Sequence, residues 1–134
     1  MRKRSLAVLL ATLLLLSGCA PALPEGVTAD QAAAGAQAAV KFFSAGDYAT
    51  LASCVREDLQ TELSAAVLEE AAALVLADAG ELIAFRDQAV QGTTDPQTGA
   101  SCAMVVLVVK YAAKQVVYTI VFDKDLSLIG FYLR

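Results

Sequence analysis

Apolar positions recur at helical spacing through the first half of the chain. Thr28 and Gln31 have the spacing of a capping box, which marks the start of a helix. The apolar stripe of this first helix follows at intervals of three and four residues: Ala32, Ala36, Ala39, Val40 and Phe43. Gly46 is the expected end of the helix, and Asp47 is the expected cap of a short second helix. The inner face of that second helix comprises Tyr48, Leu51, Ala52 and Val55.

A third helix is predicted after a polar break at residues 56–58. Ser64 has the N-cap position, and Leu63 and Leu68 flank it at the spacing of a hydrophobic staple. Gly80 is the expected end of this helix. Its apolar stripe consists of Leu68, Ala71, Ala72 and Val75.

After Gly80 the pattern changes to alternation and to β-branched residues, which is typical of strands. Strands are predicted over residues 82–90, 101–111, 115–123 and 126–133, with a loop over residues 92–100. Gly130 suggests a bulge or a bend in the last strand. Because the last connections are short, the last three strands should form an antiparallel meander. The predicted fold class is α+β, with three N-terminal helices packed on one face of a curved four-stranded antiparallel sheet.

The N-terminus has the features of an export signal. Residues 2–4 are basic, and an 11-residue, mostly apolar run follows from Leu6 to Leu16, which is too short to span a bilayer. Leu16-Ser17-Gly18-Cys19 resembles the bacterial lipobox, which implies diacylglycerol on Cys19 and cleavage before it. The domain prediction is therefore a lipoprotein signal peptide over residues 1–18, a lipidated cysteine with a short, extended tether over residues 19–27, and one α+β domain over residues 28–134. The expected location is the extracytoplasmic side of a bacterial cell membrane, with two acyl chains as a stable anchor.

Composition excludes several function classes. The net charge is −4, and without the three basic residues of the export signal the balance is seven basic against 14 acidic residues. This is the wrong sign for a nucleic-acid-binding protein. The chain has no histidine, so a His-ligated metal site and a triad with an imidazole base are both excluded. No cofactor motif is present, and no metal site is expected.

Two cysteines remain beside Cys19. Cys54 and Cys102 would close a disulfide loop in an oxidising compartment, and such a bridge would contribute up to about 4 kcal/mol. The alternative is a pair of buried thiols that behave as small apolar residues. The sequence leaves both alternatives open.

Several segments together resemble a known family. These are the corner Phe42-Phe43-Ser44-Ala45-Gly46-Asp47-Tyr48, the Leu63-Ser64 helix start, the Gly80 stop, and the terminal pattern from Tyr118 to Phe131. In order and spacing they resemble the bacterial domain-of-unknown-function family 3887, over about residues 28–134. That family is similar to short members of the ketosteroid-isomerase-like (nuclear transport factor 2-like) cone fold. The resemblance implies an accessory or binding role and a pocket between the sheet and the helices. Leu126 departs from the family pattern, which has glycine in the last hairpin turn.

The chemistry that such a pocket could contain is limited. Strict alternation would place Asp87 on the inward face with Phe85, where a raised pKa would suit a general base. The competing interpretation, which we favour, is that alternation lapses and Asp87 is solvated. Tyr111, Tyr118 and Tyr132 are candidate hydroxyl donors to a ligand, or else plain core and interface residues.

Three functions follow from these patterns. The first is a non-enzymatic, membrane-anchored module that binds a small apolar ligand, an envelope peptide or a partner protein. The second is a small isomerase- or hydratase-like enzyme that uses Asp87 or a pocket tyrosine, and the third is a purely structural envelope lipoprotein. Both faces of the second strand are apolar, while helices cover only one, which predicts a homodimer or a partner protein on the other face. The two faces carry Val105, Leu107, Val109 and Tyr111, and Cys102, Met104, Val106 and Val108.

Overall fold

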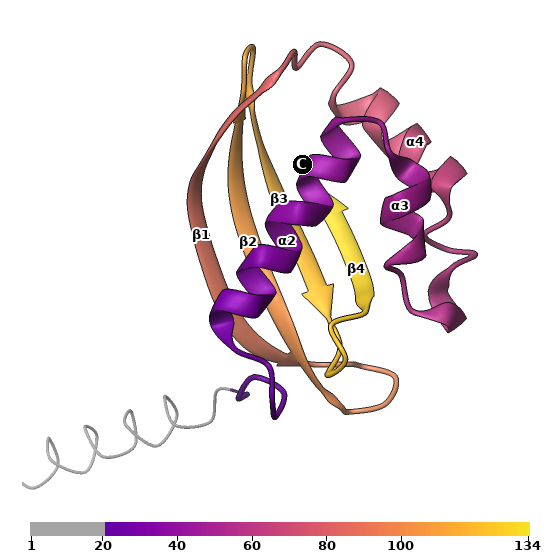
Figure 1. The fold of residues 1–134 in the computed structure, drawn as a ribbon, viewed down its shortest axis with the longest axis vertical. Helices are drawn as coiled ribbons and strands as arrows, with labels where there is room; N and C mark the ends of the chain where they lie inside the picture. The colour runs from indigo at the N-terminus through magenta and orange to yellow at the C-terminus, as the bar shows by residue number, and fades with distance from the viewer. Residues whose placement is uncertain (1–20) are drawn as a thin grey trace, which may run out of the picture.

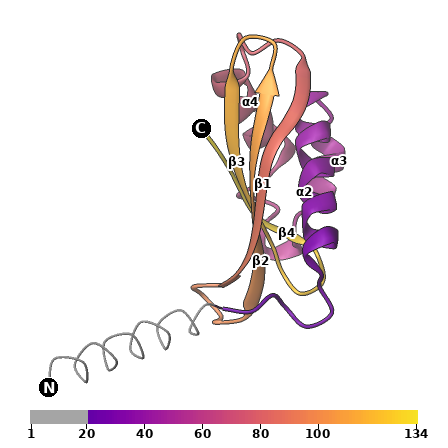
Figure 2. The same ribbon diagram turned by 90° about the vertical axis from the view of Figure 1, so that its left-hand side faces the viewer.

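Three helices cover one face of a four-stranded antiparallel sheet, and the predicted α+β fold is confirmed. The computed structural model describes residues 21–134, so the export signal and Cys19 lie outside the described residues. Figure 1 shows helix α2 (Ala29–Ser44) running along the sheet, with α3 (Tyr48–Ser53) and α4 (Ala65–Val75) beside it. Figure 2, turned by 90°, shows α2 and α3 on one side of the sheet. We call the opposite side the helix-free face.

The helix ends follow the local signals in the sequence. Thr28 and Gln31 form the predicted capping box of α2, and the Asp47 carboxylate accepts the backbone N–H of Thr50 at the start of α3. Gly46, between these helices, has φ of +77°, a left-handed conformation that favours glycine. The Ser64 hydroxyl caps α4 as expected.

Two local predictions about the helices need correction. The polar break contains a 3-10 turn, η1 (Glu57–Leu59), and α4 ends at Val75, five residues before Gly80. Gly80 instead lies in the turn that leads into the sheet, where a Cβ atom would approach the Cβ of Ala112 to 2.9 Å. Gly80 has φ of +77° in this turn, a left-handed conformation that favours glycine.

The strand order in the sheet is β1-β2-β3-β4, so each strand pairs with its neighbour in sequence. Strand β1 (Leu82–Thr94) is four residues longer than predicted, and Gly92 lies inside it rather than in a loop. Strands β2 (Ser101–Tyr111) and β3 (Gln115–Phe122) match their predictions closely, whereas β4 (Leu128–Leu133) begins two residues late. The pairing of β3 with β4 is irregular next to Gly130. Val121 pairs with Gly130, but the next residue, Phe122, pairs with Leu128.

The turn before β4 explains the late start. Leu126 has φ of +59°, a left-handed conformation that favours glycine. The Asp123 carboxylate accepts the backbone N–H groups of Asp125 and Ser127, each at 2.9 Å, and so stabilises this turn.

A bulge in β1 decides where Asp87 points. Phe85 pairs with Val109, but Asp87 pairs with Val108, so one residue of β1 has no counterpart on β2. The alternation therefore changes phase, and Asp87 lies on the helix-free face with an exposed side chain. The inward placement was wrong for this reason, and the favoured, solvated interpretation is confirmed.

Large side chains fill the space between the sheet and the helices. Phe43 from α2 packs edge-on against Tyr118 from β3, with 6.1 Å between ring centroids, and its ring lies 5.0 Å from that of Phe131. These core side chains occupy the place of the ligand pocket that the resemblance implied. The largest fully buried residues include Tyr111, Tyr118, Phe43, Leu51, Leu68, Leu107, Ile120 and Leu128.

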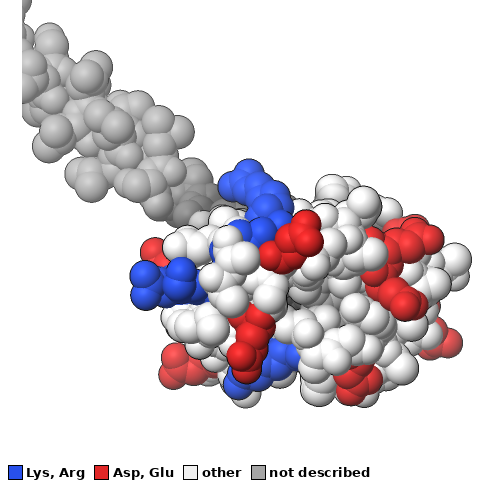
Figure 3. Space-filling model, turned by 90° about the horizontal axis from the view of Figure 1, so that it is seen from above, with Lys and Arg blue, Asp and Glu red and all other residues white. Residues whose placement is uncertain are grey.

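The surface charge is unevenly distributed. In Figure 3, only acidic side chains are seen on the right of the molecule, whereas basic and acidic side chains are mixed on the left and in the centre. Among residues 21–134, no helix is both long and apolar enough to cross a membrane.

Candidate functional site

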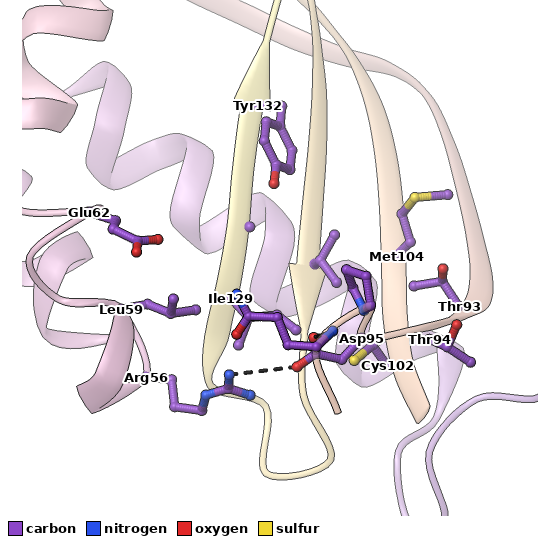
Figure 4. A pocket seen from close by; sticks show the side chains of 14 residues that line it. Arg56, Leu59, Glu62, Thr93, Thr94, Asp95, Cys102, Met104, Ile129 and Tyr132 are labelled. Carbon is purple, nitrogen blue, oxygen red and sulfur yellow. Dashed lines mark hydrogen bonds and ion pairs between the residues drawn. The ribbon is translucent and has the colours of Figure 1, made fainter. Parts of the chain in front are cut away.

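A cleft of ≈ 280 Å³ lies on the helix-free face, at the end of the sheet where β1 ends and β2 begins (Figure 4). Its floor is apolar and comes from neighbouring strands, with Met104 on β2, Val121 on β3 and Gly130 on β4. The β1–β2 loop forms one wall, and the segment from Arg56 to Glu62 forms the other. The remaining lining residues are Leu59, Thr93, Thr94, Asp95, Pro96, Gln97, Cys102, Ile129 and Tyr132.

Backbone hydrogen bonds hold both walls in place. The segment after α3 adds to the edge of the sheet, where Arg56 N–H donates to Leu128 C=O at 2.9 Å. In the β1–β2 loop, Asp95 N–H donates to Ala100 C=O at 2.8 Å, and the Asp95 carboxylate accepts Gln97 N–H at 2.9 Å. Main-chain hydrogen bonds and the Asp95 carboxylate therefore hold the two walls in place.

Arg56 lies among three carboxylates from three segments of the chain. Its Nε and Nη2 donate to the two carboxylate oxygens of Asp58 at 2.7 and 3.1 Å. Nη2 lies 3.6 Å from Asp95 Oδ2, and Nη1 lies 3.7 Å from Asp123 Oδ2. Three negative charges around one positive charge leave this end of the cleft with a net negative charge.

The pKa shifts follow from this arrangement. The hydrogen bond with Asp58 raises the pKa of Arg56 above its ordinary value, and the same bond lowers the pKa of Asp58. The Gln97 N–H, followed by weaker contributions from Thr98 and Arg56, lowers the pKa of Asp95. Asp95 is thus a carboxylate at neutral pH and a weak base, which suits binding better than proton transfer.

The two cysteines are free thiols in this structure. Cys102 is buried under the cleft, and its S–H faces Ala100 C=O at 3.6 Å. Burial, followed by the charges of Asp95 and Asp123, raises the pKa of this thiol, so it is a poor nucleophile at neutral pH. Cys54 is exposed at the end of α3.

The structure separates the candidate residues that the sequence grouped together. Tyr132 lines the cleft with 64% of its surface exposed. Tyr111 and Tyr118 are buried on the other face, where their hydroxyls hydrogen-bond each other and Tyr111 also bonds Ser44. Asp87 is outside the cleft lining.

Sequence reasoning missed Arg56 and Asp95 as site residues. It placed Arg56 in a solvated break and Asp95 in a loop. The one local signal was the Asp95-Pro96 pair, which indicates a turn but gives no sign of its partner. Arg56 and Asp95 meet only because the segment after α3 docks on β4.

A second hollow lies on the helical side. It is larger, at ≈ 410 Å³, but more open to solvent, and it lies between the end of α2 and helix α4, with Ser44, Tyr48 and Glu69 among its lining residues. Its lining offers the Ser44 hydroxyl, which already bonds Tyr111. We therefore take the cleft on the helix-free face as the candidate site.

Comparison with known proteins defines the class of this domain. Its α+β fold is similar to that of a protein from Ruminococcus gnavus ATCC 29149 whose NMR structure has been solved, with a TM-score of 0.72 and 25% sequence identity. The match covers 84% of this chain and 96% of that one. The chain belongs to the DUF3887 family, "Protein of unknown function", whose model matches residues 36–131. No curated protein matches the chain.

Proposed function

We propose that this protein is a lipid-anchored, extracytoplasmic binding module whose ligand site is the cleft on the helix-free face. The observation that carries the binding role is the cleft itself, with rigid main-chain walls, an apolar floor and a charged end. The lipid anchor is supported by the Leu16-Ser17-Gly18-Cys19 sequence after a basic and apolar leader. The bacterial cell membrane is the location that this anchor implies.

The chemistry of the cleft narrows the ligand class. Met104, Val121 and Ile129 would pack against an apolar body, and the exposed Tyr132 ring adds an aromatic surface. The excess of carboxylates around Arg56 favours a hydrogen-bond donor or a cationic group over an anion. The ligand class we propose is a small, largely apolar molecule with one donating or cationic group.

The enzyme alternative has less support. Asp87 is solvated, Asp95 is a weak base, and the Cys102 thiol has a raised pKa. The groups that line the cleft are therefore better suited to holding a ligand than to acid–base or nucleophilic chemistry. The purely structural alternative leaves the cleft without a role.

Native mass spectrometry of residues 20–134, exported by a bacterial host, tests the proposal. We expect added mass on the protein that is lost in Tyr132→Ala. The matched control is Leu74→Ala on α4, which is also an exposed large apolar side chain but lies far from the cleft. Equal added mass in both variants, or none in the wild type after ligand screening, would refute a ligand site in the cleft.

A second candidate role is assembly through the rest of the helix-free face. Its support is that Val106 and Val108, outside the cleft lining, are only partly buried on the helix-free face. The occupant in this case is a second copy of the chain. Val106→Asp should then convert a dimer to a monomer in light scattering, while a wild-type monomer at high concentration would exclude the dimer.

A further inference from the structure

The segment before the first helix is docked on the domain. The sequence predicts an extended tether here, yet Pro24 and Val27 are buried, and Leu23 packs against the core. Val27 N–H donates to Pro24 C=O at 3.0 Å and closes a turn. The segment from Leu23 to Val27 is therefore packed on the domain, only two residues after Pro21, the first residue that the structure describes.

Strand β1 accepts this segment at Gly92. A Cβ atom at Gly92 would lie 2.3 Å from the carbonyl oxygen of Pro21 and 2.4 Å from that of Ala22. Such distances are impossible, so any side chain at Gly92 would push the segment away. A glycine inside a strand is often the sign of a close backbone approach, and here the approaching backbone is the N-terminal segment.

The docking leaves very little free chain before a lipid anchor. Cys19 precedes Pro21 by two residues, and two peptide units span at most about 7–8 Å. Figures 1 and 2 show that the N-terminal segment enters at the same end of the molecule as the β1–β2 loop and the β3–β4 turn. A lipid on Cys19 would therefore hold this end, and not the opposite one, next to the bilayer.

Building on the proposed lipid attachment, we infer that the domain sits on the membrane in one fixed orientation, with the β1–β2 loop and the β3–β4 turn against the lipid headgroups. The mouth of the cleft is built partly from this loop, so the cleft opens beside the headgroup layer. Its ligand would reach it along the membrane surface. The β2–β3 turn lies at the other end, about 35 Å away along β2.

Charge alone would not produce this contact. The membrane-facing segments carry four acidic residues: Glu25, Asp95, Asp123 and Asp125. Their basic residues are Lys124 and Arg56, and the charge of Arg56 is already neutralised by its carboxylate partners. An acidic end is repelled by anionic lipids. The orientation therefore depends on the covalent anchor and the docked segment, and it should persist at high salt.

Fluorescence quenching by lipid headgroups tests the orientation. The full chain carries Cys54→Ser, is produced in a bacterial host, and is reconstituted in phosphatidylethanolamine–phosphatidylglycerol vesicles with a nitroxide on part of the headgroups. One sample bears a fluorophore at Lys124→Cys in the β3–β4 turn, and the other bears it at Lys114→Cys in the β2–β3 turn. Both positions are exposed. We expect several-fold stronger quenching at position 124, at low and at high salt.

Two variants release the constraint in different ways. Gly92→Ala displaces the docked segment, and an insert of about ten Gly and Ser residues after Ala20 lengthens the chain while the domain stays intact. Both should abolish the difference between positions 124 and 114. Gln91→Ala, the preceding residue on the other face of β1, is the matched control and should preserve it.

The mass of the N-terminal peptide separates the two possible failures. If Cys19 is acylated and positions 124 and 114 are quenched equally in the wild type, the orientation is wrong while the lipid anchor stands. If the difference survives the long insert, the docked segment does not set the orientation, and the inference is again wrong. If Cys19 carries no acyl chain, both the proposed anchor and the orientation fail.

Discussion

Three hydroxyl groups form a hydrogen-bonded chain in the interior, and its middle member should matter most for stability. Ser44 Oγ lies 2.7 Å from Tyr111 Oη, and Tyr111 Oη also bonds Tyr118 Oη. Both tyrosines are at most 1% exposed. We therefore predict unequal and non-additive effects of Tyr111→Phe and Tyr118→Phe.

The expected magnitudes follow from which groups each change leaves without a partner. Tyr118→Phe removes the end of the chain and leaves Tyr111 bonded to Ser44, so it should cost about 1 kcal/mol, the net value of one hydrogen bond. Tyr111→Phe removes both bonds and strands the buried Tyr118 hydroxyl, so it should cost about 2–4 kcal/mol. The double variant removes the stranded hydroxyl as well. It should therefore be less destabilised than Tyr111→Phe alone.

Urea unfolding of residues 20–134, followed by far-UV circular dichroism, measures these free energies. The slope of the free energy of unfolding against urea concentration should be the same in all variants. A constant slope shows that the native and unfolded states keep their compactness. In a domain of this size, 1 kcal/mol corresponds to roughly 4 °C in Tm. Equal losses for the two single variants with a double variant at their sum would refute the hydroxyl chain as described.

The same tyrosines predict a loss of stability in alkali. Burial, followed by the hydrogen bond with Tyr111, raises the pKa of Tyr118 above its ordinary value of about 10. Above that pH the unfolded chain loses a proton that the native state retains, so the free energy of unfolding falls as pH rises. Tyr118→Phe should show a smaller fall between pH 9 and 11 (about one unit on either side of the ordinary value). An identical decline in wild type and variant would contradict the assignment.

Three further predictions concern the thiols, the cleft and the core. At pH 8, iodoacetamide should modify the exposed Cys54 quickly and the buried Cys102 only after unfolding, whereas a disulfide would protect both. Because the pKa of Asp95 is lowered in the folded state, its ionised carboxylate stabilises the protein above about pH 4, and this stability is lost on acidification. Asp95→Asn should therefore make the free energy of unfolding fall less steeply as the pH is lowered. An unchanged fall would argue against the stabilising role of this carboxylate. Leu68→Ala should lower the free energy of unfolding by about 2–5 kcal/mol, because this side chain is only 1% exposed. Leu74→Ala on the same helix should change it by less than about 0.5 kcal/mol, because that side chain is 84% exposed. Comparable losses at these two positions in chemical denaturation would disprove the packing described for α4.

The local signals in the sequence were sufficient for most of the fold. A capping box at Thr28, an N-cap at Asp47 and a glycine at Gly46 act through neighbouring residues, so they can be recognised without any knowledge of the rest of the chain. The same holds for the alternation of Val105, Leu107 and Val109, which share one face in any straight strand. Helix and strand order, and with them the α+β class, follow from such signals.

The sequence by itself therefore determined the elements, their order and the resemblance to the family, while the tertiary structure decided the site. A one-residue bulge after Phe85 turned Asp87 to the helix-free face, because a single unpaired residue changes the phase of a strand. Arg56 meets Asp95 and Asp123, and Pro21 meets Gly92, through contacts between segments far apart along the chain. Contacts of this kind depend on how the sheet twists and which edge each segment joins, and no local pattern encodes them.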